Sequence, residues 1–181
     1  MPESARLLLR GWREEDRAPF AALNADPEVM AHFPAVLSRE ESDEVFERVA
    51  AGVDERGWGL WALELRDTGE FLGFTGLAAP RFETVFTPCV EVGWRLARSA
   101  WGHGYAVEAA RVACAVGFDE LGLAEIVSFT SVGNVRSRAV MERLGMRHDP
   151  AEDFDHPLVP AGHALSRHVL YRLQRPDGAA G

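Results

Sequence analysis

Hydrophobic and polar residues follow two periods along this chain, one typical of strands and one typical of helices. Short apolar or alternating segments predict strands over residues 6–10, 60–65, 71–79, 89–96, 125–131 and 167–173. Apolar positions three and four residues apart predict helices over residues 13–24, 38–57 and 134–145, and over the second half of residues 98–118. This order predicts one mixed α/β domain, antiparallel in its first half and with helical crossovers later.

Local residue choices mark several of these boundaries. Ser38 and Glu41 have the spacing of a capping box at the start of the second helix, and Gly57 marks its end. The turn sequence DTGE, between the strands at 60–65 and 71–79, predicts a hairpin. Gly93 interrupts an alternating strand, which predicts a bulge or the close approach of another backbone.

Composition narrows the class of protein. The chain has 181 residues, 47% of them hydrophobic, and we expect one domain over residues 1–175 with a loose tail over residues 176–181. A net charge of -9 argues against a nucleic-acid or anionic-membrane partner and favours a cationic one. Cys89 and Cys114 form no metal or redox motif, so buried reduced thiols are expected. Neither a signal peptide nor a membrane span is evident at the start, which predicts a cytoplasmic protein.

The segment WGHGYA, Trp101–Ala106, places two glycines in front of an amphipathic helix. Glycine lets a backbone approach a ligand, and a helix start presents unpaired N–H groups, so this loop is typical of a phosphate site. A tight strand-to-helix turn is the alternative. A dinucleotide fingerprint would need a third glycine where the chain has Val107, and a P-loop would need Gly-Lys-Ser/Thr.

The helix over residues 134–145 carries a second candidate. Ser137 shares one face with Val140, Met141 and Leu144, so its hydroxyl is expected to point inward near the helix start. The alternative is that Ser137 only assists capping beside Asn134.

Together, WGHGYAVEA and NVRSRAVMERLGM resemble the acetyl-CoA signature of the GNAT N-acetyltransferase superfamily, more narrowly its RimJ/RimL-type branch. The resemblance covers roughly residues 5 to 173 and includes NADPEVMAHF, GFTGL and VEVGWRL. It implies a central, mostly antiparallel sheet of six to seven strands flanked by about four helices. Two positions depart from the superfamily pattern: the loop begins with the aromatic Trp101, and Met141 stands where many members have a tyrosine acid.

The resemblance implies transfer of acetyl from acetyl-CoA to a primary amine, with no metal. It assigns coenzyme binding to Val92, Trp94, Trp101, Gly102, His103, Gly104, Tyr105, Ala106, Asn134, Arg136 and Ser137. A backbone N–H beside Gly93 would support the acetyl carbonyl, and Ser137 would supply the acid. The competing hypothesis is a non-catalytic acyl-CoA-binding or sensing domain on the same fold. A homodimer is the assembly that we consider.

Glu91 is the candidate base. It shares a strand face with Gly93 and Arg95, opposite Val92 and Trp94, and a carboxylate on a central strand is costly unless it has a task or a partner. A structural pair with Arg95, or simple exposure, is the alternative.

The last polar cluster contains His156, His163 and His168. Its spacing matches no zinc motif, and a loop near the acceptor pocket is the more informative interpretation. The acceptor itself is left open among peptide N-termini, polyamines, aminoglycosides and amino-acid-like amines.

Overall fold

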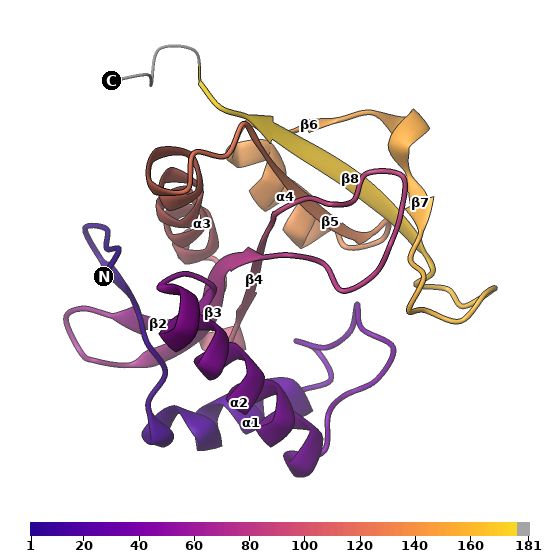
Figure 1. Cartoon of the computed structure of the whole chain (residues 1–181). Helices are drawn as coiled ribbons and strands as arrows, with labels where there is room; N and C mark the ends of the chain where they lie inside the picture. Colours follow the sequence, from indigo (N-terminus) through magenta and orange to yellow (C-terminus); the bar gives the residue numbers. More distant parts are fainter. Residues whose placement is uncertain (177–181) are drawn as a thin grey trace.

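A computed structural model describes residues 1–176, and a twisted sheet runs through their centre (Figure 1). The strands are β1 Leu7–Arg10, β2 Leu60–Leu65, β3 Phe71–Ala78, β4 Glu91–Leu96, β5 Glu125–Ser131, β6 Arg147–His148, β7 Phe154–Asp155 and β8 Arg167–Gln174. The helices are α1 Arg17–Ala25, α2 Arg39–Arg56, α3 Tyr105–Ala115 and α4 Val135–Arg143. The predicted fold class is confirmed; the short strands β6 and β7 are too brief to leave a hydrophobic pattern.

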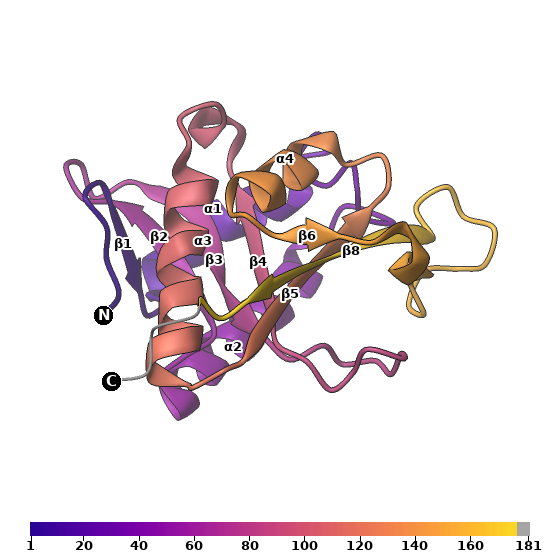
Figure 2. The same cartoon turned by 90° about the horizontal axis from the view of Figure 1, so that it is seen from above.

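The strand order is β1-β2-β3-β4-β5-β8-β6, with β7 also paired to β8. Only β4 and β5 run parallel; the other neighbours are antiparallel. A parallel pair needs a crossover connection, and α3 supplies it. Figures 1 and 2 show α3 on one side of the sheet and α1 on the other. The parallel pair therefore marks the point where the two halves of the chain meet.

Two apolar clusters pack on the sheet, because alternate residues of each strand point to opposite faces. The larger one joins the helix α3 to β3, β4 and β5 through Leu77, Val92, Leu96, Ala109, Ala113 and Ile126. The smaller one joins α1 and α2 to β3 through Phe20, Leu23, Phe46 and Phe74. Residues of β4 that are not used by the larger cluster thus face the α1 side.

The second helix begins and ends as its sequence predicts. The Ser38 hydroxyl accepts from Glu41 N at 3.1 Å, the Glu41 carboxylate accepts from Ser38 N at 2.7 Å, and Gly57 ends the helix with φ of 74°. The first helix differs, because the 3₁₀ turn Glu14–Asp16 precedes α1. The Asp16 carboxylate accepts from the main chain of Arg13 at 2.8 Å, which closes this tighter turn.

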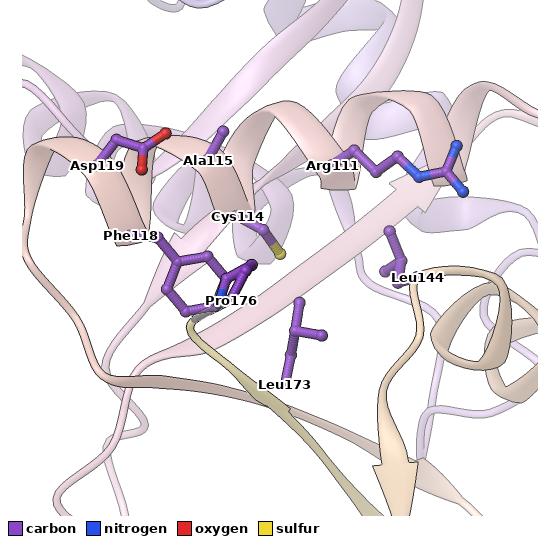
Figure 3. Close-up of a pocket in the computed structure, with 8 residues that line it drawn as sticks. All are labelled: Arg111, Cys114, Ala115, Phe118, Asp119, Leu144, Leu173 and Pro176. Atoms are coloured by element: carbon purple, nitrogen blue, oxygen red, sulfur yellow. The ribbon is translucent and has the colours of Figure 1, made fainter. Parts of the chain in front are cut away.

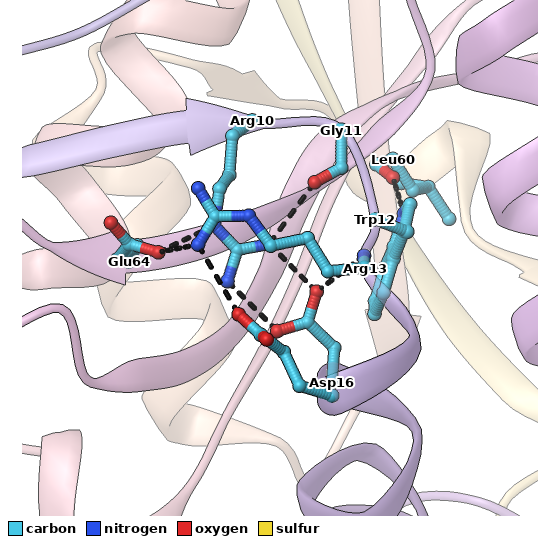
Figure 4. A network of polar contacts seen from close by, with 8 residues as sticks. Arg10, Gly11, Trp12, Arg13, Asp16, Leu60 and Glu64 are labelled. Carbon is cyan, nitrogen blue, oxygen red and sulfur yellow. Dashed lines mark hydrogen bonds and ion pairs between the residues drawn. The ribbon is translucent and has the colours of Figure 1, made fainter.

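A buried ion network lies at the same place (Figure 4). Arg10 and Asp16, each 2% exposed, form a bidentate pair with N–O distances of 2.6 and 2.8 Å. Arg10 Nε also donates to Glu64 at 2.5 Å, and Trp12 Nε1 donates to the Leu60 carbonyl at 2.7 Å. The network therefore ties β1 and β2 to the first helical turn.

Of the two interpretations of Gly93, a bulge and a close backbone approach, the bulge is wrong. Pairing between β3 and β4 is continuous from Gly73 with Leu96 to Ala78 with Glu91. Gly93 stands opposite another glycine, Gly76, so the two backbones pair without a side chain on either strand at that level. A register shift lies instead between β2 and β3, where Leu63 pairs with Gly73 and the next residue, Glu64, pairs with Phe71.

The third helix was expected to continue to Phe118, but α3 ends at Ala115 and passes into the π turn Val116–Glu120. Within that turn, a Cβ on Gly117 would lie 2.7 Å from Ile126 Cδ1, so the wider turn brings backbone directly against β5. Of the two free thiols, Cys114 is buried as predicted, whereas Cys89 is only half-buried. The expected tail, apart from Pro176, lies outside the described residues.

Candidate active site

The loop after β4 holds the two glycines that the sequence analysis singled out. It begins at Trp101, whose Nε1 donates to the Leu96 carbonyl at 2.9 Å. Gly102 and Gly104 both have φ of +80°, a conformation that disfavours side chains. The helix α3 starts directly afterwards, at Tyr105. Both glycines are therefore required by the turn that leads into the helix.

The main-chain N–H groups of residues 102–107 form the chemically active part of this loop. Within residues 1–176 none of them donates a hydrogen bond, and the first intrahelical donor is Glu108, which bonds to the Gly104 carbonyl at 3.1 Å. Free amides at a helix N-terminus attract anions through their hydrogens and through the helix dipole. The loop has the donor set that a phosphate group needs.

The outer side of the loop is held by Arg6, which the sequence analysis did not single out. Its guanidinium donates to the His103 carbonyl at 3.1 Å and pairs with Glu108. It also lies 4.7 Å from the centre of the Tyr105 ring, which stacks on His103 at 5.3 Å. The Tyr105 ring thus contacts both His103 and Arg6, while Arg6 holds the His103 main chain.

The start of α4 carries the second predicted motif. Asn134 caps the helix, because its Oδ1 accepts from Ser137 N at 3.2 Å. Its Nδ2 donates to Thr130 Oγ1 at 2.9 Å and to Ser137 Oγ at 3.1 Å. The Ser137 hydroxyl therefore accepts one hydrogen bond, and its own proton has no acceptor among the described residues.

The two motifs meet through Arg136, whose guanidinium lies 4.3 Å from the centre of the Trp101 ring. Two other arginines of these segments, Arg98 and Arg138, make different contacts. Arg98 pairs with Glu28 at 2.6 Å, and Arg138 donates to a main-chain carbonyl at 3.2 Å. Of these three, only Arg136 joins the loop to α4.

A gap between β4 and β5 leads toward this loop. The strands pair at a single position, Glu91 with Val127, although both continue beyond it. The Val90 carbonyl accepts from Val127 N at 2.9 Å, and peptide groups alternate sides along a strand. The N–H groups of Trp94 and Leu96 therefore face the gap, in the part of β4 that β5 does not cover. Predicted binding residues Val92 and Trp94 thus border it through their main chains.

Glu91 lies where this gap closes. Burial raises the pKa of its carboxyl group to about 8. No hydrogen bond or ion pair holds this carboxyl among the residues that the structure describes, so the alternative of a structural pair with Arg95 is wrong. Burial also lowers the pKa of Arg95 to about 10, without any contribution from Glu91. Both groups are therefore desolvated independently.

Aromatic side chains surround two of the three predicted histidines. His156 and His168 have ring centres 4.8 Å apart, and His156 also contacts Phe82 at 4.6 Å and Phe129 at 5.9 Å. Burial, together with His168, lowers the pKa of His156 to about 4, so it is neutral at physiological pH. His163 is exposed and joins none of these contacts. The cluster is apolar in character.

His32, in the connection between α1 and α2, makes a polar contact that the hydrophobic pattern of the sequence could not predict. Its Nδ1 lies 3.0 Å from the Ser131 hydroxyl at the end of β5. Burial and the nearby Arg136 both lower the pKa of His32. It belongs to the segment NADPEVMAHF, so the resemblance did point to the segment but not to this residue.

A pocket between α3, α4 and the end of β8 lies away from all of these groups (Figure 3). It has a volume of about 330 Å³ and is lined by Arg111, Cys114, Ala115, Phe118, Asp119, Leu144, Leu173 and Pro176. Burial raises the pKa of the Cys114 thiol to about 12, so this cysteine is not a nucleophile.

Within residues 1–176 no three His, Cys, Asp or Glu side chains are placed to hold a metal ion. Among the same residues, every helix is too short or too polar to cross a membrane.

Comparison with known proteins places this geometry in a family. Residues 6–147 match the acetyltransferase (GNAT) domain. An uncharacterized Bacillus subtilis protein, YkkB, is 34% identical over 79% of this chain and 83% of its own length. The FsC-acetyl coenzyme A-N(2)-transacetylase of Aspergillus fumigatus is 32% identical over 96% of this chain and 79% of its own length.

Solved structures of acetyltransferases are similar to this one in fold. An acetyltransferase from Agrobacterium tumefaciens is 29% identical with a TM-score of 0.76, covering 96% of this chain and 93% of its own. RimL, an alpha-N-protein acetyltransferase solved with coenzyme A, shares the fold at 17% identity with a TM-score of 0.73, covering 96% of each chain. The chain belongs to the GNAT acetyltransferase family and is an acyltransferase.

Proposed function

We propose that this enzyme transfers acetyl from acetyl-CoA to a primary amine by direct attack in a ternary complex, and that it belongs to the RimJ/RimL-type branch. The observation that carries the proposal is the gap between β4 and β5. It closes at an unpaired carboxyl group, Glu91, and opens toward the free amides of residues 102–107. The proposed base and the proposed anion site would therefore stand at opposite ends of one opening.

The residues around this gap fit coenzyme A. The amides of residues 102–107 would bind the pyrophosphate, because they lack acceptors and lie at the start of α3. The N–H of Trp94 faces the gap and would donate to an oxygen placed there. Arg136 and Asn134 lie at the start of α4, beside the loop, because Arg136 contacts Trp101. Bound acetyl-CoA would supply an activated acetyl group as a thioester.

Glu91 is suited to take a proton from the incoming amine. A primary amine is mainly protonated near neutral pH and cannot attack in that form. A carboxylate attracts the ammonium group, and with its pKa raised to about 8 it accepts the proton more readily than an ordinary glutamate does. The proton passes to a carboxylate oxygen of Glu91, either directly or through one water molecule.

Ser137 is suited to the opposite task. Its oxygen accepts from Asn134, which fixes its position, while its own O–H proton is available to a group in the gap. Met141, at the position of the family's usual tyrosine, has no proton to give and is 1% exposed. The hydroxyl of Ser137 is thus the donor that we assign at the start of α4.

The acceptor is proposed to be cationic, because the chain carries a net charge of -9 and Glu91 would meet the amine as an ammonium. Relatives of this fold are named for different amines: alpha-amino groups of proteins for RimL, and an N(2) group for the fungal transacetylase. A cytoplasmic location and a homodimer are carried over from the sequence as parts of this proposal.

The test measures thiol release from acetyl-CoA in the presence of a panel of amines, including peptides, polyamines, aminoglycosides and amino acids. Release that depends on one of these amines, with the acetylated amine detected by mass spectrometry, is the expected result. Coenzyme binding without transfer to any amine would overturn the proposal.

A further inference from the structure

One face of β4 carries two charged groups separated by a residue without a side chain. Because alternate residues share a face, Glu91, Gly93 and Arg95 all lie on the side opposite α3. A Cβ placed on Gly93 would meet, within 4 Å, only the Glu91 Oε1 atom, at 3.8 Å. The space above Gly93 is therefore open, with an acid at one end and a guanidinium at the other.

The Arg95 guanidinium is held firmly in place. Its Nη1 donates to Asn24 Oδ1 at 2.5 Å, and Asn24 is itself buried and fixed by a 2.9 Å hydrogen bond to Ser42. The aromatic rings of Phe33 and Phe74 lie 4.1 and 5.3 Å from the guanidinium carbon. These contacts orient the cation, but none of them neutralises it.

Arg95, which is half-buried, also lacks a counter-ion within the described part of the chain. No carboxylate among residues 1–176 pairs with it, and its buried Nε has no hydrogen-bond acceptor. A desolvated charge without a counter-ion is costly, and proteins normally pair it. Arg10, which is almost fully buried, illustrates the rule, because two carboxylates hold it. An anion bound beside Arg95 would neutralise this unpaired charge.

We propose that the acceptor carries a carboxylate as well as the reacting amine, and that Arg95 binds this carboxylate while Glu91 receives the amine. Arg95 is then the specificity-determining residue, and the open space above Gly93 accommodates the body of the acceptor. The inference rests on the proposed function and names its substrate class.

The spacing on the strand limits the length of this acceptor. Glu91 and Arg95 are four residues apart, which separates their Cα atoms by roughly 13 Å in an extended strand. An amine and a carboxylate on one carbon are too close together to reach both side chains comfortably. The expected class is an amino acid whose amine is at the end of its side chain, as in lysine.

The test compares two acceptors that differ only in the carboxylate, Nα-acetyl-lysine and N-acetylcadaverine. Both present the same primary amine and the same acetamide. We expect kcat/KM to be higher for the lysine derivative by about tenfold or more, because the analogue leaves the Arg95 cation unpaired. Equal values for the two compounds would overturn the inference while leaving N-acetyltransfer intact.

Substitutions of Arg95 test whether this residue causes the preference for the acceptor that carries a carboxylate. Arg95→Gln should bring the ratio of the two kcat/KM values to about one, whereas Arg95→Lys, which keeps the charge, should retain part of the preference. Arg39→Gln is the matched control, because Arg39 lies on the surface of α2 and pairs there with Asp43. Each ratio is internal to one variant, so a partial loss of folded protein does not change it.

Three outcomes contradict the inference in different ways. If the ratio of the two kcat/KM values is unchanged in Arg95→Gln, another group binds the carboxylate. A raised KM for acetyl-CoA with an unchanged ratio assigns Arg95 to the coenzyme. If wild-type enzyme acetylates neither compound but does acetylate another amine of the panel, the acceptor class is wrong; if it acetylates no amine, the proposed function itself fails.

Discussion

The guanidinium of Arg136 lies 4.3 Å from the centre of the Trp101 ring. Trp101 begins the loop before α3, and Arg136 lies in the first turn of α4. Contacts of this kind stabilise by about 0.5 to 2 kcal/mol, depending on how far the cation is desolvated. Two segments that are distant in the sequence therefore form one wall, and the tryptophan that departs from the superfamily pattern is the residue that joins them.

The loop can be tested through Gly104. We expect Gly104→Val to abolish most of the thermal stabilisation by acetyl-CoA, because a β-branched residue disfavours φ of +80° and displaces the free amides. At a ligand concentration 100-fold above Kd, the wild-type protein should gain about 2.7 kcal/mol. Thermal denaturation with and without acetyl-CoA measures this.

Gly122→Val is the control, since Gly122 has φ of +66° and lies beyond the far end of α3. It should lower the melting temperature by a similar backbone strain but keep the ligand-induced shift. A full shift in Gly104→Val would show that the coenzyme binds elsewhere.

Ser137→Ala should keep coenzyme affinity and lower kcat by about 10²- to 10⁴-fold, the usual contribution of a positioned proton donor. Steady-state assays with a good acceptor measure kcat, and calorimetry measures the affinity for the coenzyme. Thr130→Val is the matched control, because Thr130 accepts the other hydrogen bond of Asn134 Nδ2. Equal losses of kcat in both variants would return Ser137 to a capping role.

Glu91→Gln should remove the ionisation near pH 8 from the pH dependence of kcat/KM. In the wild-type enzyme, activity should rise as Glu91 loses its proton. In the variant, activity should be lost most severely at low pH and recover in part at high pH, where free amine is plentiful. A pH profile identical to that of the wild type would exclude Glu91 from the mechanism.

The same variant should change stability in a defined direction. The pKa of Glu91 is raised on folding, so folding favours the protonated form, and stability is lost as the pH rises from the unfolded pKa through about 8. Glu91→Gln, which cannot ionise, should therefore melt at a higher temperature than wild type at pH 9 and show little difference at pH 4. A lower melting temperature at pH 9 would indicate a structural task for the carboxylate.

Asp16→Ala should destabilise the protein by about 3 to 5 kcal/mol, because it leaves the buried Arg10 cation without its bidentate partner. Urea denaturation measures the loss. Glu3→Ala is the control: Glu3 is exposed and lies 3.8 Å from Arg66, so about 0.5 kcal/mol or less is expected. A similar effect of both substitutions would contradict the importance assigned to this network.

Local signals in the sequence were sufficient for most elements. Ser38 with Glu41, Gly57 and the glycines of the loop act through their own neighbours, and each stands where it was expected. The predicted bulge at Gly93 failed because its environment depends on Gly76, a residue of another strand. The predicted length of α3 was wrong for a similar reason, because the change to a π turn accompanies the contact of Gly117 with Ile126 of another element.

The residues of the candidate site likewise divide into those that local sequence predicts and those that depend on contacts between distant segments. The glycine loop and the start of α4 are contiguous segments, so their residues could be named from the sequence. The sequence could not predict whether Glu91 pairs with Arg95. The answer depends on how Asn24 and Phe33, from the α1 side, contact the Arg95 guanidinium. Arg6 and His32 reach the site from distant segments, and isolated charged residues carry no periodic signal.

The single pairing of Glu91 with Val127 gives β4 an unusual status, because a strand at the centre of the sheet has one uncovered edge. Uncovered edges recruit other strands, and proteins normally protect them at the periphery with charges or bulges. Here the protecting group would be the coenzyme itself. Without it, the enzyme should be more prone to edge-to-edge aggregation, so ligand supply would govern solubility as well as catalysis.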